Sequence, residues 1–401
     1  MLLQKKGKID MIINAKKIGG KMKKNLKISI LILLGILLAI VIARYITDED
    51  FRYLVDTKVL KKELEQDTLS TIEINYESTP SIFAYDKYVA VLNKNNFNIY
   101  THDGNKTASL DIKISNPVVC SRGKYMVVAE QDGKKIYLIN GSNIAWQNDI
   151  NGAISGVNVN KNGYVSVIVT NTTYKSVVIL YSPEGKELFR SFLSSTYAVC
   201  TDISNNNKYL AIGEVDYTGT IVKSNVEIIS IALAQSNTEK TKSVINKYQS
   251  NTGEIISAIR YQVKDIAMCM FNKYIQKVGT DSNEKYIDIN DDVLFFDMGL
   301  KDKFTTINKQ SSGLFAYEYE MKIKNTGTSS EHLYILKNDV PKSIIVSSEL
   351  IGINLGTEVQ IVNSNGMLLK SYKSKQEIKS LVVGDNIAGI IYKDKIELIG
   401  L

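Results

Sequence analysis

The chain is 401 residues long and carries 49 basic and 42 acidic residues, a formal charge of +7. Nine lysines and one acidic residue precede Ile28, so the rest of the chain holds 40 basic and 41 acidic residues and is nearly neutral. Because binding to nucleic acid depends on clustered positive charge in the folded body, this distribution argues against a nucleic-acid partner.

The first predicted element is a membrane-spanning helix over residues 26–46, which follows a basic tail over residues 1–25. Residues 28–43 form an almost wholly apolar run, which would reach about 24 Å as a helix. Apolar neighbours on both sides extend the run toward the roughly 30 Å of a bilayer core. The lysines of the tail predict a cytoplasmic N-terminus and a C-terminal body outside the membrane.

Two other interpretations of this segment stay open, a cleaved secretory signal and a core helix of a soluble protein. A signal peptidase needs small residues just after the apolar run, and residues 40–45 offer no clean match. An uncleaved signal anchor is therefore favoured. Met22, which precedes two further lysines, has the form of a start for such an anchor, and the residues before it are then an unstructured or mis-assigned leader.

A short amphipathic helix is predicted next, over residues 47–67. Apolar residues recur there near helical spacing with charged residues between them, namely Phe51, Leu54, Val55, Val59 and Leu64. The favoured interpretation is a juxtamembrane stalk that packs on the body, and a partner-binding coil is the alternative.

From residue 68 to residue 401 the pattern becomes strand-like, with short runs rich in Val, Ile and Tyr between turns of Asn, Asp, Gly and Ser. One phrase returns four times, with an aliphatic residue five positions before a turn glycine, at Gly104, Gly141, Gly185 and Gly366. The distance from Tyr88 to the first of these glycines equals that from Tyr125 to the second. A repeat of about 40 to 50 residues in a strand-rich chain predicts an all-β, WD40-like β-propeller.

A blade count follows from the third strand of each repeat. One aliphatic residue per third strand gives eight markers, at Ile99, Ile136, Leu180, Ile228, Ile275, Ile323, Ile361 and Ile396. They are 35 to 48 residues apart, which suits one four-stranded blade each, so eight blades are favoured and seven are the alternative. The last repeat has only three strands, so the segment Thr68–Tyr76 is predicted to supply the fourth and close the ring.

The sequence nominates no catalytic, cofactor-binding or metal-binding residue. The two histidines, His102 and His332, lie in separate predicted blades, and no nucleophile-elbow, P-loop or dinucleotide motif is present. The acidic stretch Asp281–Asp292 departs from a calcium loop, because Tyr286 stands where glycine is needed and Asp292 where glutamate belongs. This stretch is predicted to be a solvated loop between strands.

Cys120, Cys200 and Cys269 lie in apolar, strand-like runs, which predicts buried side chains, and no spacing indicates a metal site or a disulfide. The segment Asn140–Trp146 resembles the glycine-to-tryptophan phrase with which quinoprotein-like propellers staple neighbouring blades. It occurs once and contains the only tryptophan of the chain, so it favours that fold without a quinone cofactor.

Together with the lysine-led anchor, three segments resemble one family: Asp48–Asp56, Lys161–Ile168 and Gly384–Leu398. They are similar to an uncharacterised family of membrane-anchored, propeller-like proteins from low-GC Gram-positive bacteria. The resemblance covers nearly the whole chain and implies no activity and no catalytic residue.

We therefore expect a single-pass protein of the cell membrane whose propeller lies outside. We expect it to bind or scaffold a protein, a peptide or a cell-envelope ligand and not to be an enzyme. The alternatives are a hydrolase or lyase acting on an envelope polymer at the central channel, and a sensor that signals through the helix. Converging Asp, Glu, Arg or Tyr side chains in the channel would favour catalysis, and an apolar or aromatic patch on one rim would favour binding.

Overall fold

The structure is a computed structural model that describes residues 33–47, 51, 55, 70–74, 80–93, 96–236, 242–263, 265–289, 292–311, 317–328, 330–336, 340–347 and 349–401. The chain divides into two compact units, Met1–Glu65 and Gln66–Leu401.

In the first unit, residues 33–47 form a helix whose aliphatic side chains are exposed. None of the helices among the described residues has the length and apolar character needed to cross a membrane. The predicted span over residues 26–46 lies partly outside the described residues. The basic tail over residues 1–25 and most of the helix predicted over residues 47–67 also lie outside them.

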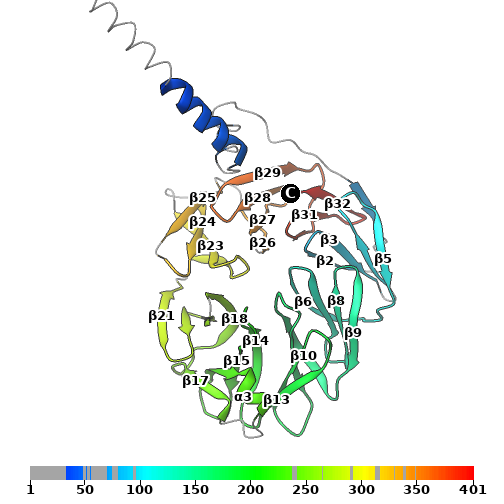
Figure 1. Ribbon diagram of the computed structural model, residues 1–401, viewed down its shortest axis with the longest axis vertical. Coiled ribbons are helices and arrows are strands. Elements are labelled where there is room, and N and C mark those ends of the chain that lie inside the picture. The colour runs from blue at the N-terminus through cyan, green and yellow to red at the C-terminus, as the bar shows by residue number, and fades with distance from the viewer. Residues whose placement is uncertain are drawn as a thin grey trace, which may run out of the picture. The chain divides into compact units, whose positions relative to one another are not determined.

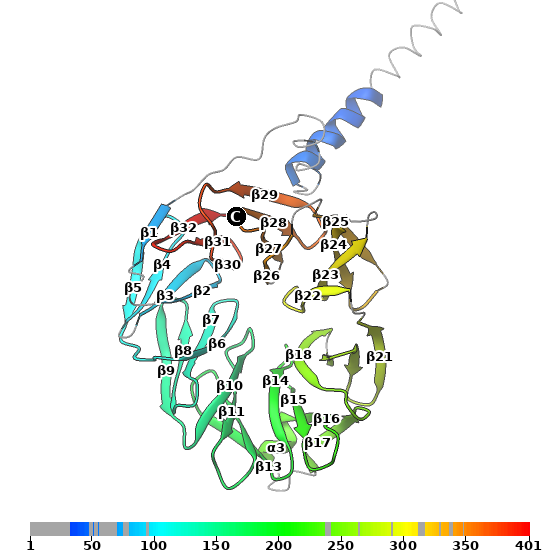
Figure 2. The same cartoon turned by 180° about the vertical axis from the view of Figure 1, so that it is seen from behind.

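The second unit is an eight-bladed β-propeller (Figure 1). Its described residues form eight four-stranded antiparallel sheets arranged around a ring, which Figure 2 shows from behind. All eight aliphatic markers lie in the third strand of a sheet, and all are buried. The prediction of eight blades is therefore confirmed, and the alternative of seven is wrong.

The strands of blades one to four are β2 (Ser81–Tyr85), β3 (Tyr88–Leu92), β4 (Phe97–Tyr100), β5 (Lys106–Leu110), β6 (Pro117–Arg122), β7 (Tyr125–Glu130), β8 (Lys135–Asn140), β9 (Asn143–Asp149), β10 (Ala153–Val159), β11 (Val165–Thr170), β12 (Ser176–Tyr181), β13 (Glu187–Leu193), β14 (Tyr197–Ile203), β15 (Tyr209–Asp216), β16 (Lys223–Ser230) and β17 (Val244–Gln249). Those of blades five to eight are β18 (Ile256–Val263), β19 (Ile266–Phe271), β20 (Tyr274–Val278), β21 (Asn283–Asp288), β22 (Val293–Asp297), β23 (Lys303–Ser311), β24 (Tyr317–Asn325), β25 (Glu331–Ile335), β26 (Ser343–Val346), β27 (Leu350–Asn354), β28 (Glu358–Asn363), β29 (Leu368–Lys373), β30 (Ser380–Val383), β31 (Ile387–Ile391), β32 (Lys395–Gly400) and β1 (Ser70–Glu73).

Strand β1 closes the ring as predicted. It pairs antiparallel with β32, from Ser70 opposite Leu398 to Glu73 opposite Lys395, and becomes the outermost strand of blade eight. Its alternation explains the placement, because Ile72 is buried between two exposed neighbours and packs at the junction of blades eight and one.

The core of the propeller is divided among the junctions between blades. Eight clusters of buried apolar residues lie one at each junction of neighbouring sheets. Each sheet is thus covered on both faces. Its middle strands therefore contain continuous runs of apolar residues and not an alternation of apolar and polar ones. In β7, for example, Met126 to Ala129 are all buried.

The repeated glycine phrase is a hairpin turn between the third and fourth strands of a blade. Gly104, Gly185 and Gly366 have φ of +78°, +81° and +78°. Each donates its amide to the carbonyl three residues earlier. Left-handed backbone favours glycine because it has no Cβ. In blade four the short helix α3 (Ile231–Ser236) follows the third strand instead, which explains why the glycine pattern is absent from that blade.

The loop predicted over Asp281–Asp292 is wrong for its central part. Residues 283–288 form β21, the outermost strand of blade five, while residues 290 and 291 lie outside the described residues. An outermost strand needs only one covered face, so its exposed Asn283, Glu284 and Lys285 are compatible with a strand. Tyr286 and Ile287 supply the covered side, packed at the junction with blade six.

Trp146 on β9 staples blade two to blade three. Its ring lies 5.6 Å from that of Tyr181 and covers the turn glycine Gly185. The amide of Asn148 donates to the Gly185 carbonyl at 3.3 Å. The single glycine-to-tryptophan phrase of the chain therefore serves one junction.

Replacing Ile72 by alanine should lower the free energy of unfolding by about 2–4 kcal/mol, because it removes buried aliphatic surface at the ring closure. Glu73→Ala, on the exposed side of the same strand, is the matched control and should change stability little. Urea unfolding of the full chain measures both. Equal effects of the two variants on the free energy of unfolding would show that burial of Ile72 does not stabilise the ring closure.

Gly185→Ala should destabilise the protein more than Gly141→Ala. Both glycines have positive φ, +81° and +58°, so both variants lose about 1 kcal/mol in the backbone. A Cβ at residue 185 would lie 2.7 Å from Cγ of Trp146, whereas one at residue 141 meets nothing within 4 Å. The difference between the two variants in urea unfolding should be about 1–3 kcal/mol, the cost of displacing the indole. Equal losses in the free energy of unfolding would show that the indole of Trp146 can move aside without cost.

Candidate functional site

The first strand of each blade lines the central channel of the ring (Figure 1). Cavities lie near the ends of several of these strands. A cavity of about 260 Å³, which we call the channel pocket, is lined by Arg122, Asp202, Arg260 and neighbouring turns. A second cavity of about 220 Å³ and a third of about 350 Å³ adjoin it, and Arg260 and Gly299 line all three. The pocket reaches the surface, since exposed Lys161 is part of its wall.

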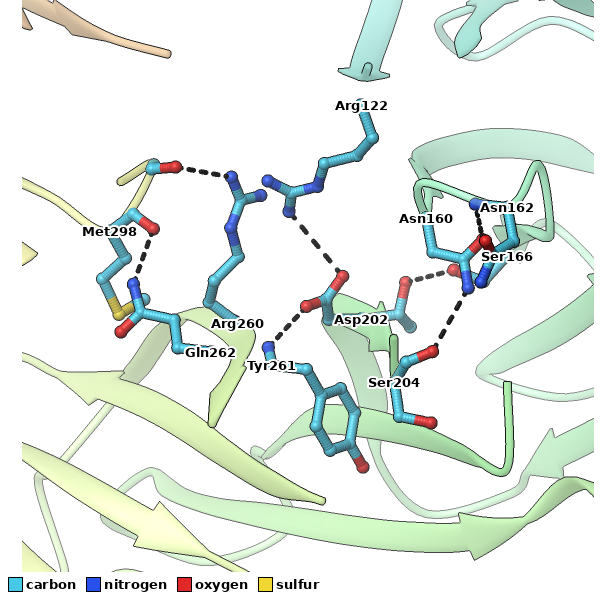
Figure 3. A network of polar contacts seen from close by, with 12 residues as sticks. Arg122, Asn160, Asn162, Ser166, Asp202, Ser204, Arg260, Tyr261, Gln262 and Met298 are labelled. Atoms are coloured by element: carbon cyan, nitrogen blue, oxygen red, sulfur yellow. Dashed lines mark hydrogen bonds and ion pairs between the residues drawn. The ribbon is translucent and has the colours of Figure 1, made fainter. Parts of the chain in front are cut away.

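Asp202, near the end of β14, is the buried acid of this pocket (Figure 3). Its side chain is 4% exposed; its Oδ1 lies 3.8 Å from Nη2 of Arg122, and its Oδ2 accepts the backbone N–H of Tyr261 at 2.6 Å. Burial raises the pKa of Asp202, and the charge of Arg122 and the hydrogen bonds that the carboxylate accepts oppose this rise in part. The carboxylate is therefore held in place at an electrostatic cost.

Arg260 on β18 extends toward Arg122, and the two guanidinium groups face each other (Figure 3). Arg260 donates one hydrogen bond, from Nη2 to the carbonyl of Gly299 at 3.4 Å. Gln262, two residues along the same strand, donates its amide to three carbonyls of blade six, those of Met298 at 2.9 Å, Leu300 at 3.1 Å and Lys303 at 2.6 Å. This anchoring fixes β18, and with it Arg260, against the next blade.

Blades three and four are joined beside the pocket by a second polar cluster (Figure 3). Asn160 donates to the carbonyl of Ser204 at 3.2 Å and to Oδ1 of Asn207 at 2.6 Å. The hydroxyls of Ser166 and Thr201 lie 2.8 Å apart in the interior. Because buried hydrogen-bond networks are rigid when satisfied, β14 presents Asp202 to the channel in one position.

A second acid of the channel, Asp297 at the end of β22, is half-buried and is influenced by the charge of Arg122. Its Oδ1 accepts the N–H of Gly299 at 2.5 Å. Burial raises its pKa, and that hydrogen bond and the charge of Arg122 lower it in part. Two polar atoms of the pocket wall, Nη2 of Arg122 and Oε1 of Gln262, are buried without a hydrogen-bond partner among the described residues. Such atoms are uncommon in folded proteins.

The opposite face of the propeller carries exposed aromatic side chains, which we call the aromatic rim: Tyr174, Phe192, Tyr197 and Tyr217, between 38% and 55% exposed. In blade four, Tyr197 begins the first strand and Tyr217 follows the end of the second; in blade three, Tyr174 lies in the loop after the second strand and Phe192 on the outermost strand β13. The rings of Tyr174 and Phe192 are 4.8 Å apart, and those of Tyr197 and Tyr217 are 5.9 Å apart. Lys175 links the pairs, with Nζ 5.2 Å from the ring centre of Tyr197.

The residues discussed from sequence lie apart from the channel pocket. His102 is in an exposed turn of blade one, and His332 is on β25 of blade six. The three cysteines are free; Cys269 is buried as predicted, whereas Cys120 and Cys200 are only partly buried. Desolvation raises the pKa of each thiol, that of Cys200 to about 12. Over the described ranges, no group of three or more His, Cys, Asp or Glu side chains is arranged to hold a metal ion.

Sequence reasoning missed the arginines and the buried acid of the pocket. The available signal is a charged residue within or at the end of the first, innermost strand of a blade, as with Arg122, Asp202 and Arg260. Most of the other residues of these strands are apolar or small, and Asp297 at the end of β22 is a further charged exception. The charge marks a strand that faces the channel.

Asp202→Asn should change how stability depends on pH. The folded-state pKa of Asp202 is raised, so its contribution to the free energy of unfolding is full below the ordinary value near about 4 and is lost as pH rises through the folded-state pKa. Asparagine does not titrate and keeps an acceptor for the Tyr261 amide. The stability of the variant relative to wild type should therefore rise with pH above about 4.

Urea unfolding at several pH values measures this difference. Asp111→Asn, at an exposed position, is the control and should give a nearly constant offset. A relative stability of Asp202→Asn that is flat or decreases with pH would contradict the raised pKa.

The fold is similar to that of solved propellers. The C-terminal WD40 domain of Sif2 matches with a TM-score of 0.54 and 12% identity, over 84% of this chain and 98% of that domain. Sqt1 of Chaetomium thermophilum, bound to the N-terminus of ribosomal protein L10, matches with a TM-score of 0.53 and 10% identity, over 84% of this chain and 100% of that one. Apo AztD of Citrobacter koseri matches with a TM-score of 0.50 and 11% identity, over 78% and 91%.

At these identities the similarity concerns the fold alone. A comparison with curated proteins gave no significant match. A family model described as a family of unknown function, DUF5711, matches residues 60–401, which is most of the chain. This match and the fold confirm the expected resemblance as far as it concerns an uncharacterised family of propellers. The chain belongs to the DUF5711 family of unknown function.

Proposed function

We propose that this protein is a membrane-anchored, extracytoplasmic binding or scaffolding module rather than an enzyme, and that its partner is a protein, a peptide or another component of the cell envelope. The anchor is supported by the lysine-rich tail followed by the apolar run at residues 28–43. The exposed aliphatic side chains of the helix at residues 33–47 add to this support, because a lipid environment would cover them.

The observation that carries the binding function is the aromatic rim. Tyrosine and other aromatic residues are enriched in protein interfaces, where they offer large contact area at a small entropy cost. Here four such rings lie exposed over two neighbouring blades, held in pairs and linked by Lys175. Each pair joins one ring on a strand, Phe192 on β13 or Tyr197 on β14, to one in a neighbouring loop, so part of the ordering cost is met before binding.

The similarity to Sqt1 supports the same proposal. That propeller was solved with a peptide segment, the N-terminus of ribosomal protein L10. A propeller of comparable size can thus hold a peptide, and the aromatic rim is the surface of this chain that we expect to do so.

Photo-crosslinking in intact cells tests the proposal. A benzophenone side chain at position 197 or 217 should capture the same partner, and Tyr174→Ala should reduce that capture by about tenfold or more, as expected for an interface hot spot. Leu333, which is 54% exposed on β25 of blade six, provides a control position for exposed apolar surface and should not capture it.

Capture of the same partner from position 333, or capture of no partner from positions 197 and 217, would contradict a partner at the aromatic rim.

The second candidate function, a hydrolase or lyase for an envelope polymer, is favoured by the buried Asp202 and the half-buried Asp297, which both interact with the charge of Arg122 in the channel. Turnover of envelope polymer by the purified full chain, lost in Asp202→Asn, would establish that alternative instead.

A further inference from the structure

The propeller is poor in arginine. Of the 49 basic residues five are arginines, and three of these belong to the second unit, Arg122, Arg190 and Arg260. Two of the three line the channel pocket, although they come from blades two and five. Lysine supplies the other positive side chains of the propeller. Arginine at this place therefore points to a need for its flat, forked group of donors and not for charge alone.

The donors of both arginines are largely unused. Arg122 makes no side-chain hydrogen bond to a described residue, since Asp202 at 3.8 Å is beyond hydrogen-bond distance, and its Nη2 is buried. Arg260 makes one long hydrogen bond, at 3.4 Å to Gly299, and no ion pair with a described residue. Two cations that face each other with free donors are repelled unless an anion lies between them.

The acids of the pocket do not fill this role. Asp202 already accepts the Tyr261 amide, and burial disfavours its charge. The wall of this pocket holds four cations and three acids: Arg122, Lys161, Arg260 and Lys301 against Asp202, Asp302 and Asp385. A fourth acid, Asp297, lines the adjoining cavity, and its carboxylate accepts the amide of Gly299, so it makes no hydrogen bond to either arginine. The donors of the two arginines, and not the net charge of the wall, are therefore what the pocket leaves unmatched.

We propose that Arg122 and Arg260 hold an oxyanion, the carboxylate or phosphate group of a ligand, between their guanidinium groups in the channel pocket (Figure 3). Guanidinium groups bind such oxygens through paired, charge-assisted hydrogen bonds. The pocket of about 260 Å³ is several times the roughly 30 Å³ that one water occupies, so the group fits. This site lies on the opposite face of the propeller from the aromatic rim and does not rest on the proposed function.

Calorimetric titration of the purified full chain tests the site, in chloride buffer of constant ionic strength. Inorganic phosphate and succinate are the two probes. We expect saturable binding of at least one of them, and the tighter probe assigns the phosphate or the carboxylate source. Arg122→Gln and Arg260→Gln should each weaken binding at least tenfold, and Arg260→Lys, which keeps the charge but loses the fork, should weaken it less.

Arg190→Gln is the matched control. Arg190 is the third arginine of the propeller and forms a pair of 2.7 Å hydrogen bonds with Glu187 on the outer strand β13. Its replacement should leave binding of the anion unchanged. Unfolding curves of each variant show whether it is folded before its titration is interpreted.

Modification of the wild-type chain by phenylglyoxal gives a readout that needs no variant. The bound probe should protect Arg122 and Arg260, and not Arg190, in peptides analysed by mass spectrometry. Absence of saturable binding of either probe at millimolar concentrations would overturn the proposal. Unchanged binding by folded Arg122→Gln and Arg260→Gln would do so too. So would phenylglyoxal modification of Arg122 and Arg260 to the same extent with the probe as without it.

Discussion

The propeller depends on the pairing of β1 with β32. Each blade buries both faces because it has a neighbour on each side, and the eight apolar clusters exist only as junctions between sheets. A ring with one strand missing leaves an edge of unpaired backbone groups and weakens the junction of blades eight and one. Every other feature, including the geometry of the channel, follows from closure.

Closure also gives the two ends of the channel different chemistry. First strands begin at one end and finish at the other, so a single strand can serve both surfaces. Strand β14 begins with Tyr197 on the aromatic rim and ends beside Asp202 in the channel pocket. The two proposed sites therefore lie on opposite faces, where ligands of different kinds would not compete for space.

Much of the fold was predictable because its signals are local. The eight aliphatic markers identify third strands, since a strand covered on both faces must be apolar at that position. The turn glycines identify hairpins, since left-handed backbone excludes most other residues. Strand β21 was not predicted because an outermost strand has one exposed face, and its polar residues resemble those of a loop. The channel pocket was not predicted for a different reason. Arg122 and Arg260 come from blades two and five, and only the curvature of the closed ring brings them together.

The strand that completes the ring is made first and its partner last. Residues 70–73 of β1 are synthesised long before residues 395–400 of β32, so this sheet cannot form until β32 has been made. Until then β1 has no partner strand and the face of blade one toward blade eight is uncovered, and contacts so distant in sequence form slowly. The same pairing that closes the ring therefore ties completion of the propeller to the synthesis of its most distant strand.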